Sequence, residues 1–513
     1  MRVKNSLRNF ASGISINLVG SLLAFISRTV FIKVLGSSYL GVNGLLANVL
    51  SMLSLAELGI GTAINFSLYK PIADDDEQKI GALMNFYKIA YRWIGVLVFF
   101  VGLILMLFLD IIIKDAGDVK NIKLIFLIYL INTSYSYFMT YKNTLIGAYQ
   151  KGYLLAPINI VFDIINVVMQ ITVLLLTKNY IAYLLTNMFV LFIQRLYINN
   201  KITKMFPILQ EKSKEKIPKK ELNTIIRNVK AMLFHKVGDY CINSTDNIII
   251  TAFISVSVTG IYSNYPMLIS MINGIIVMFF NSMTASMGNL IATGDDKRKI
   301  EIFNVINFIG FWLFGFAAIC FYNLLSPFIE LWLGKGFLVS QFTLAIVVLN
   351  YYLTGMRVPV HTIKASAGLY DEDKFTPLIQ SVINLVISIV LVQKIGLVGV
   401  FIGTLVSSIM LPCWQRPYIV CKYALNISAK GYFIKYFKYL SVVLCNALGI
   451  SLILNFFFIE PTIINFSVRM IICIVIPNLS FVIIFKKTSE FKEIVSIIDS
   501  IIGGRIKWIK RLV

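Results

Sequence analysis

Long runs of apolar residues recur along the whole chain and are separated by short breaks rich in Gly, Pro, Asn or charge. About 20 mainly apolar residues let an α-helix cross a bilayer, and by this criterion the pattern predicts about 14 transmembrane helices. The predicted fold class is therefore an all-α polytopic membrane protein. The expected spans are 11–35, 44–67, 83–112, 122–145, 154–177, 181–199, 231–254, 262–288, 302–325, 341–362, 375–393, 397–420, 437–458 and 467–485.

Two sequence matches indicate an internal duplication. The matching pairs are 34–53 with 253–272, and DDEQKI at 75–80 with DDKRKI at 295–300. Their offsets are 219 and 220 residues, and Gly41 aligns with Gly260. Because repeats of this kind place a transport path between two halves, we expect two parallel six-helix lobes around a central cavity, followed by two C-terminal helices.

Breaks in the apolar pattern give the expected domain organisation. It comprises an N-terminal six-helix lobe (1–200), a basic cytoplasmic linker (201–230), a second six-helix lobe (231–425), two additional transmembrane helices (426–486) and a cytoplasmic amphipathic tail (487–513). The tail alternates Ile and Val with charged residues at helical spacing, which is typical of a helix that lies in the membrane interface.

The composition supports the membrane prediction, since 58% of the residues are hydrophobic and only 14% are charged. The net charge of +22 alone would also suit a nucleic-acid-binding protein. However, most of the 47 Lys and Arg residues lie in loops on one side of the predicted spans. That bias is the usual topology signal of membrane proteins. It predicts that both termini are cytoplasmic, and it argues against a nucleic-acid partner.

Motifs of catalysis and metal binding are missing from the sequence. The six Cys residues are scattered singly through apolar segments, and the chain has only two His residues. No phosphate-binding loop or HExxH motif is present, although such motifs mark the commonest ATP and zinc sites. We therefore expect no enzyme activity, no metal and no cofactor, with H⁺ or Na⁺ as the candidate coupling ion.

Five charged residues are expected deep inside predicted spans: Arg28, Glu57, Asp163, Asp239 and Asp246. Intramembrane charges usually face a partner or a water-filled cavity and mark functional sites. Arg28 is a candidate contact for an anionic substrate, or else one half of a structural ion pair with Glu57. The acids are candidates for the cavity lining or for a proton or sodium site, with a structural hydrogen-bond network as the alternative.

Basic residues near the cytoplasmic ends of the spans form a second group of candidates. They are Lys142, Lys236, Arg357 and Lys364. Together they could line a vestibule that attracts a phosphate-bearing lipid. Alternatively, each could extend to the lipid headgroups, as terminal Lys and Arg side chains commonly do.

Five segments of the sequence carry a family resemblance. They are LSLAELGIGTAINFSLYKPIADDDEQKI (53–80), NSTDNIIITAF (243–253), GIYSNYPMLI (260–269), SMTASMGNLIA (282–292) and PFIELWLG (327–334). This set resembles the polysaccharide repeat-unit (Wzx-like) flippases of the multidrug/oligosaccharidyl-lipid/polysaccharide (MOP) exporter superfamily. No segment in it is a catalytic motif.

The resemblance implies a protein of the bacterial plasma membrane. It would move undecaprenyl-pyrophosphate-linked oligosaccharides from the inner to the outer leaflet by alternating access, for capsular or other surface polysaccharides. Expected partners are the lipid-linked oligosaccharide, membrane lipids, and the polymerase and glycosyltransferases of the pathway. Arg28 would fill the place of a first-span arginine found in related lipid flippases. Alternative cargoes are lipid II, a teichoic-acid precursor, or a drug exchanged for a cation. A membrane glycosyl polymerase is a third reading, disfavoured by short outer loops.

Overall fold

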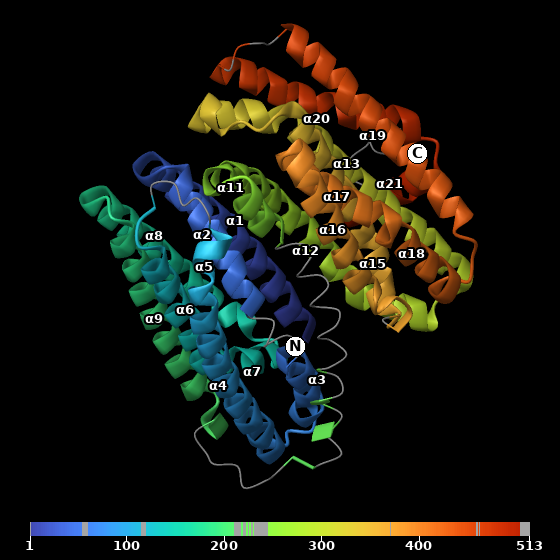
Figure 1. Ribbon diagram of the computed structural model, residues 1–513. Helices are drawn as coiled ribbons and strands as arrows, with labels where there is room; N and C mark the ends of the chain where they lie inside the picture. Colours follow the sequence, from blue (N-terminus) through green and yellow to red (C-terminus); the bar gives the residue numbers. More distant parts are fainter. Residues whose placement is uncertain are drawn as a thin grey trace. The chain divides into compact units, whose positions relative to one another are not determined.

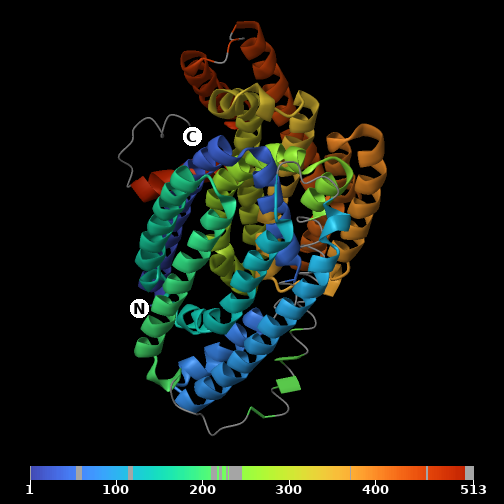
Figure 2. The ribbon, with the colours of Figure 1, turned by 60° about the vertical axis from the view of Figure 1, so that its left-hand side comes forward.

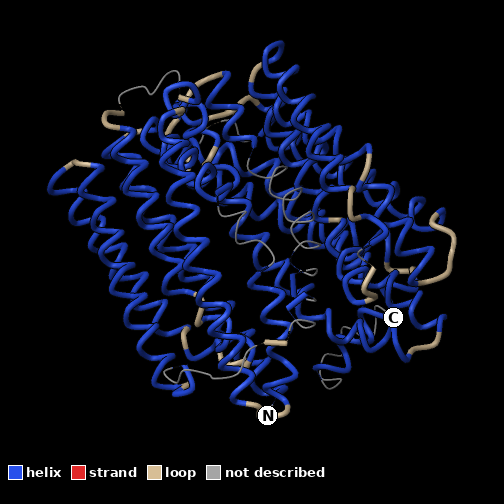
Figure 3. The backbone as a smooth tube through the Cα atoms, turned by 60° about the horizontal axis from the view of Figure 1, so that its bottom comes forward, coloured by secondary structure: helices blue, strands red, loops and turns tan. Residues whose placement is uncertain are grey.

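The computed structural model describes residues 2–53, 60–113, 119–209, 245–369, 371–457, 460 and 462–502, together with a few positions between 217 and 229. Helices account for nearly all of these residues, and no strand occurs among them. Figure 3 shows the helices in blue, joined by short tan loops. The all-α class predicted from the apolar pattern is confirmed.

Within the described residues, 12 helices are long and apolar enough to cross a membrane. They correspond to 12 of the predicted spans, so the chain is a multi-pass membrane protein. The predicted spans 44–67 and 231–254 include residues outside the described part, and they stay predictions. The same holds for the side on which the termini lie and for the predicted lobe boundaries.

The chain divides into two compact units, which we call the N-terminal and C-terminal units (Figure 1). The N-terminal unit comprises 1–264 and 377–381, and the C-terminal unit comprises 265–376 and 382–513. The described part of the N-terminal unit includes the helices α1 (Arg2–Leu35), α2 (Ser37–Leu53), α3 (Ile60–Ala73), α4 (Glu77–Leu107), α5 (Leu109–Ile112), α6 (Ile122–Thr140), α7 (Asn143–Ala148), α8 (Ala156–Thr177), α9 (Tyr180–Met205) and α11 (Val256–Tyr262), with short 3₁₀ turns η2 (Gly152–Leu154) and η3 (Pro207–Leu209). Residues 245–253 are helical as well.

The described residues of the C-terminal unit also form helices joined by short loops (Figures 1 and 2). Its elements are α12 (Asn264–Thr293), α13 (Asp296–Leu333), η4 (Lys335–Phe337), α14 (Gln341–Gly355), α15 (Arg357–Ser366), η5 (Asp371–Asp373), α16 (Thr376–Ile395), α17 (Leu397–Met410), α18 (Pro412–Ile419), the π-helical turn η6 (Val420–Ala424), α19 (Lys430–Phe457), α20 (Ile463–Phe485) and α21 (Ser489–Ile502). The first residue of α12 and part of α16 belong to the N-terminal unit.

Local sequence explains several helix boundaries. Gly36 separates α1 from α2 and has a φ of +85°, a left-handed conformation that glycine adopts without a Cβ penalty. Asn179 begins α9, and its side chain accepts a hydrogen bond from the backbone N–H of Ile181 at 2.8 Å. Thr462 caps α20 in the same way by accepting from the N–H of Asn465 at 3.2 Å. Such caps satisfy N–H groups that have no partner within the helix.

Aromatic side chains join α13 to the two C-terminal spans α19 and α20. The rings of Phe311 and Tyr439 stack with their centroids 4.4 Å apart, and Phe311 also lies 4.8 Å from Phe481. Phe311 and Phe481 are completely buried. Aromatic pairs at this separation add stability beyond the area that they bury. This packing fixes the three helices together and places their far ends around the cavity described below.

Helix α21 lies in the stretch expected to form an amphipathic tail, and it packs against α13 and α19 of the same unit. Arg298 of α13 contacts Glu493 at 2.9 Å, and Lys435 of α19 contacts Glu490 at 2.5 Å. Burial would raise the pKa of the Glu490 carboxyl. Hydrogen bonds from Lys435 and from nearby groups outweigh that effect and lower the pKa below its ordinary value of 4.5.

The lowered pKa of Glu490 predicts a pH-dependent contribution to stability. A carboxyl with a depressed pKa in the folded state stabilises the protein above its ordinary pKa, and the contribution disappears as the pH falls through the folded value. We expect the thermal midpoint of wild type to exceed that of Glu490→Gln at neutral pH. The difference should vanish well below pH 4.5. Thermal unfolding of both proteins across this range measures it, and a pH-independent difference would contradict the prediction.

Candidate functional site

Arg28 of α1 is held by the junction between α11 and α12, within the N-terminal unit. Its Nε donates a hydrogen bond to Oδ1 of Asn264 at 2.8 Å, and its Nη2 donates to Oγ of Ser263. Asn264 is completely buried, and its amide nitrogen donates to the carbonyl oxygen of Ile261 at 3.0 Å. The backbone of α11 therefore fixes the side chain of Asn264, whose oxygen accepts the hydrogen bond from the guanidinium of Arg28. Two segments far apart in sequence set the position of this charge.

Beside this junction, α2 and α11 cross in close backbone contact. A Cβ atom on Gly41 would lie 1.9 Å from the carbonyl oxygen of Val256, and one on Gly260 would lie 2.0 Å from that of Ser37. The hydroxyls of Ser37 and Ser257 are 2.9 Å apart. Small residues spaced by four allow helix backbones to approach in this way.

The crossing joins the two copies of the predicted repeat. Gly41 contacts the segment that contains Gly260, and Gly260 contacts the segment that contains Gly41. This reciprocal pattern is what a local two-fold relation between equivalent elements produces. The alignment of these two glycines in the sequence therefore corresponds to a direct structural contact.

Two further cations of the N-terminal unit bind neutral oxygen atoms. Lys142 is buried and donates to Oγ1 of Thr203 on α9. Arg195 of α9 is partly buried and donates to Oδ1 of Asn132 on α6 at 2.8 Å. In the part of the chain that the structure describes, neither has a carboxylate within ion-pair distance. Their charges are thus available to an anion.

Arg195 is absent from the candidates that the sequence supplied. It stands near the end of the predicted span 181–199, where an arginine usually extends to the headgroups. In the structure it instead turns to Asn132, a polar residue inside the neighbouring span. Comparing the depths of polar residues on neighbouring predicted spans would have suggested that Arg195 and Asn132 form a pair.

Asp163 lies on a polar stripe of α8. Two neighbours on this stripe are bonded to α9: Asn166 donates to Asn187 at 2.9 Å, and Asn159 accepts from Gln194 at 3.2 Å. Asp163 falls between them at helical spacing and is half-buried. The carboxylate therefore belongs to a polar seam within the N-terminal unit.

Asp246 stands close to α11. One of its carboxylate oxygens is buried, and its charge acts on the hydroxyl of Tyr262. The other acidic candidates, Glu57 and Asp239, and the basic candidate Lys236 lie outside the described residues. The alternative of an Arg28–Glu57 ion pair and the candidate ion site at Asp239 and Asp246 accordingly stay predictions. No group of three or more potential metal ligands occurs among the residues that were placed.

The basic candidates of the C-terminal unit are buried in α15. The ammonium of Lys364 forms an ion pair with Asp373, and their side chains are 5% and 1% exposed. Nε of Arg416 lies 3.6 Å from the same carboxylate. Arg357, two turns before Lys364 on α15, donates to Oγ1 of Thr354 at 2.9 Å. The geometry favours a structural role for Lys364, because Asp373 occupies its charge.

Breaking the Lys364–Asp373 pair should destabilise the protein strongly. Removing one partner of a buried ion pair leaves an uncompensated charge and costs about 3–5 kcal/mol. We expect Lys364→Met to reduce the yield and thermal midpoint of the purified protein. The double variant Lys364→Met/Asp373→Leu should recover only part of the loss, since it removes the buried carboxylate as well but also takes it away from Arg416. Normal stability of the single variant together with lost transport would instead place Lys364 in the substrate path.

Comparison with known proteins identifies the class of fold. No protein-family model matches the chain, and no curated protein matches it by sequence. Solved structures do match, and this chain shares its fold with structures of MATE transporters and of the lipid II flippase MurJ.

Three of these structures illustrate the likeness. The lipid II flippase MurJ in an inward closed conformation is 14% identical, covers 94% of this chain and 99% of its own, and has a TM-score of 0.65. An inward-facing multidrug resistance MATE family transporter of the MOP superfamily is 15% identical, covers 80% of this chain and 98% of its own, and has a TM-score of 0.61. A variant of the Vibrio cholerae MATE transporter VcmN is 13% identical, with coverages of 83% and 99% and a TM-score of 0.57.

Proposed function

We propose that this chain is a flippase that moves undecaprenyl-pyrophosphate-linked oligosaccharide repeat units from the inner to the outer leaflet of a bacterial plasma membrane. It would serve the synthesis of capsular or other surface polysaccharide. The proposed mechanism is alternating access, in which a site near the middle of the membrane opens to one side at a time. Both termini would then be cytoplasmic, as the charge bias of the loops indicates.

The observation that carries the proposal is the combination of this fold with cations inside the N-terminal unit. Lys142 and Arg195 have neutral oxygen atoms as hydrogen-bond partners, and a guanidinium binds a phosphate through two parallel hydrogen bonds. Arg28 adds a third cation, which is bonded to the junction between α11 and α12. A pyrophosphate is the anionic group that such sites recognise.

The three cations lie at different depths in the proposed orientation. Arg28 is seven residues from the end of α1, and Arg195 is 15 residues from the start of α9. These positions correspond to about 10 Å and about 22 Å from the same side of the membrane. Lys142 follows the last turn of α6 on the opposite side. Successive contacts of this kind suit an anion that crosses the membrane.

Coupling to a proton or sodium gradient completes the proposal. Asp163 on α8 and Asp246 on the predicted span 231–254 are the candidate acids for binding such an ion, and both belong to the N-terminal unit. No phosphate-binding loop occurs in the sequence, so direct use of ATP has no support. Polyprenyl-pyrophosphate-linked oligosaccharide is the proposed substrate, and the polymerase and glycosyltransferases of the pathway are proposed partners.

One observation favours a second cargo, lipid II. The match to the lipid II flippase extends over 94% of this chain, compared with 80% for the inward-facing MATE transporter. A lipid cargo is therefore favoured over drug–cation antiport, while the choice between the two lipid-linked glycans needs an experiment.

Reconstitution of the purified chain in liposomes tests the proposal directly. Two fluorescent cargoes are supplied in parallel, an undecaprenyl-pyrophosphate-linked oligosaccharide and lipid II, and the fraction reaching the opposite leaflet is measured with a membrane-impermeant quencher. We expect the oligosaccharide lipid to flip faster, and to respond to an imposed H⁺ or Na⁺ gradient. Faster flipping of lipid II would select the second candidate. Flipping of neither, with export of a cationic dye, would overturn both.

A further inference from the structure

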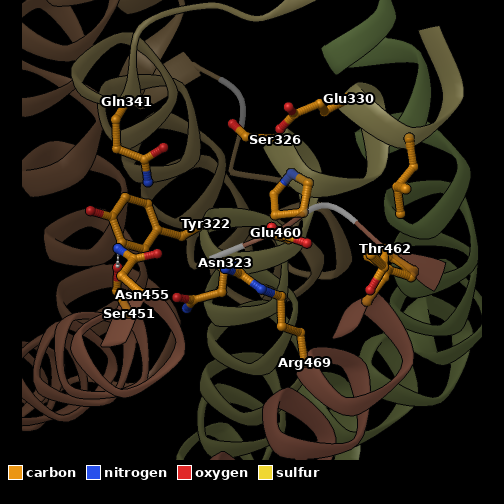
Figure 4. A pocket seen from close by; sticks show the side chains of 13 residues that line it. Tyr322, Asn323, Ser326, Glu330, Gln341, Ser451, Asn455, Glu460, Thr462 and Arg469 are labelled. Atoms are coloured by element: carbon orange, nitrogen blue, oxygen red, sulfur yellow. Dashed lines mark hydrogen bonds between the residues drawn. The ribbon is translucent and has the colours of Figure 1, made fainter. Parts of the chain in front are cut away.

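A polar cavity of about 250 Å³ lies in the C-terminal unit, at the ends of α13, α19 and α20 (Figure 4). It is remote in sequence from the three cations of the proposed function, Arg28, Lys142 and Arg195. The lining comes from the second half of α13, the end of α19 and the start of α20, together with Gln341 at the start of α14 and Glu460 between α19 and α20. The lining residues that carry polar groups are Tyr322, Asn323, Ser326, Glu330, Gln341, Ser451, Asn455, Glu460, Thr462 and Arg469.

The inner wall of the cavity is buried and polar. Asn323 and Arg469 are 5% and 8% exposed. The amide nitrogen of Asn323 donates to the carbonyl oxygen of Ile319 at 2.9 Å. The amide oxygen of Asn323 therefore points away from Ile319. In Figure 4 the side chains of Asn323, Glu460 and Arg469 converge on the middle of the cavity. Burying a guanidinium and an amide here is expensive unless polar groups surround them.

The outer rim supplies groups that both donate and accept hydrogen bonds. Glu460, Asn455 and Thr462 are exposed at this end, and the amide of Asn455 faces the hydroxyl of Ser451 at 3.4 Å. Between rim and inner wall, Phe466 and the ring of Tyr322 provide apolar surface. The cavity therefore combines planar polar groups with aromatic faces, as small-molecule sites do.

Charge decides which ligand this lining suits. The cavity contains two carboxylates, Glu330 and Glu460, and one guanidinium, Arg469. Lys335 Nζ lies 4.0 Å from the carboxylate of Glu330, so the charges that remain are those of Glu460 and Arg469, and the lining is close to neutral. An anion in the cavity would be repelled by both carboxylates, and a cation would be repelled by the buried guanidinium. A neutral ligand with many hydroxyl groups satisfies both kinds of side chain, since each hydroxyl donates once and accepts twice.

Size narrows the ligand further. Pockets for drug-sized ligands measure about 300–1,000 Å³, and this cavity is smaller. We propose that the cavity binds one uncharged sugar ring, with Asn323, Glu460 and Arg469 bonding its hydroxyls and Tyr322 or Phe466 covering its apolar face. The charge bias of the loops puts this end of α13 on the outer side of the membrane. The sugar then comes from an exported lipid-linked glycan or from free glycan outside the cell.

The proposed sugar site can be tested independently of the proposed function, because sugar binding is measured without any transport. Purified full-length protein is prepared in an amine-oxide detergent, which has no sugar headgroup to compete. Binding of D-glucose, N-acetyl-D-glucosamine, D-glucuronate and choline is followed by saturation-transfer NMR. We expect saturable binding of a neutral sugar, at least fivefold weaker binding of D-glucuronate, and none of choline. Absence of saturable binding by either neutral sugar would overturn the proposal and leave a cavity that holds only water.

Variants of the exposed rim keep the test independent of folding. Glu460→Gln and Asn455→Ala should each weaken sugar binding at least fivefold while thermal stability stays at the wild-type value. The matched control Glu372→Gln alters an exposed carboxylate outside the cavity and should change nothing. Thr462 is not a suitable target because it caps α20. Wild-type affinity in both rim variants would also overturn the proposal.

A flipping measurement separates the two sources of sugar. If the ligand belongs to the cargo, Glu460→Gln lowers the flipping rate as well as sugar binding. If the ligand is free glycan, the variant loses binding and flips cargo normally. Arg28→Ala should retain sugar binding whatever its transport, since Arg28 lies in the other unit. A protein that binds sugar yet flips neither cargo would overturn the proposed function alone.

Discussion

Arg28→Ala is expected to reduce the initial rate of flipping more than tenfold in proteoliposomes. A hydrogen bond to a charged group contributes about 1.5–3 kcal/mol, and every 1.4 kcal/mol corresponds to about a tenfold change. Arg28 is also held by Ser263 and Asn264, so its position is fixed before any cargo arrives. The measurement is the flipping rate of the undecaprenyl-pyrophosphate-linked oligosaccharide, divided by the amount of monodisperse protein.

A structural role for Arg28 must be separated from a role in substrate binding. Arg28→Lys keeps the charge and loses the planar fork that matches a phosphate, so it should retain part of the activity and most of the stability. Asn264→Ala removes a partner of the guanidinium while leaving the charge in place. Wild-type flux in Arg28→Ala at normal protein yield would remove Arg28 from the site.

The alternative of an Arg28–Glu57 ion pair gives a different pattern of effects. If the pair is structural, Glu57→Ala should destabilise the protein about as much as Arg28→Ala. The double variant would then lose little more, because partners in one interaction are not additive. If Arg28 instead contacts the cargo, Arg28→Ala should change the transport rate more than the thermal stability. The two single variants should then differ in which of these two measurements they affect.

Features set by local sequence were predictable, and the spans show why. A run of about 20 apolar residues has few options other than a membrane helix, so the all-α polytopic fold followed directly. The turn at Gly36 also followed, since a glycine between two apolar runs marks a break. The repeat even indicated that Gly41 and Gly260 are equivalent. It did not indicate that they touch.

Partners of buried charges were not predictable from local sequence. Arg28 and Asn264 are 236 residues apart, and no local sequence feature near either residue indicates the other as its partner. The partner of Lys364 was closer, because Asp373 follows nine residues later across a turn. A buried ammonium usually has a carboxylate nearby, and this rule would have indicated Asp373 as the partner of Lys364.

The close crossing of α2 and α11 predicts opposite effects for two glycines on the same helix. Alanine is favoured over glycine inside a helix by about 0.5–1 kcal/mol. At Gly44 a Cβ meets nothing within 4 Å, so Gly44→Ala should be neutral or stabilising. At Gly41 the same Cβ would stand 1.9 Å from the carbonyl oxygen of Val256. A backbone atom cannot rotate away as a side chain can.

Gly41→Ala should therefore lower the thermal midpoint and the yield of folded protein, with a loss of at least the about 1–3 kcal/mol typical of overpacking. Gly260→Ala should behave in the same way, because its Cβ would stand 2.0 Å from the carbonyl oxygen of Ser37. The double variant should lose less than the sum of the two, since one separation of the helices relieves both clashes. Thermal unfolding of the four proteins beside wild type measures these differences. Equal midpoints for Gly41→Ala and Gly44→Ala would show that α2 and α11 do not cross this closely in the membrane.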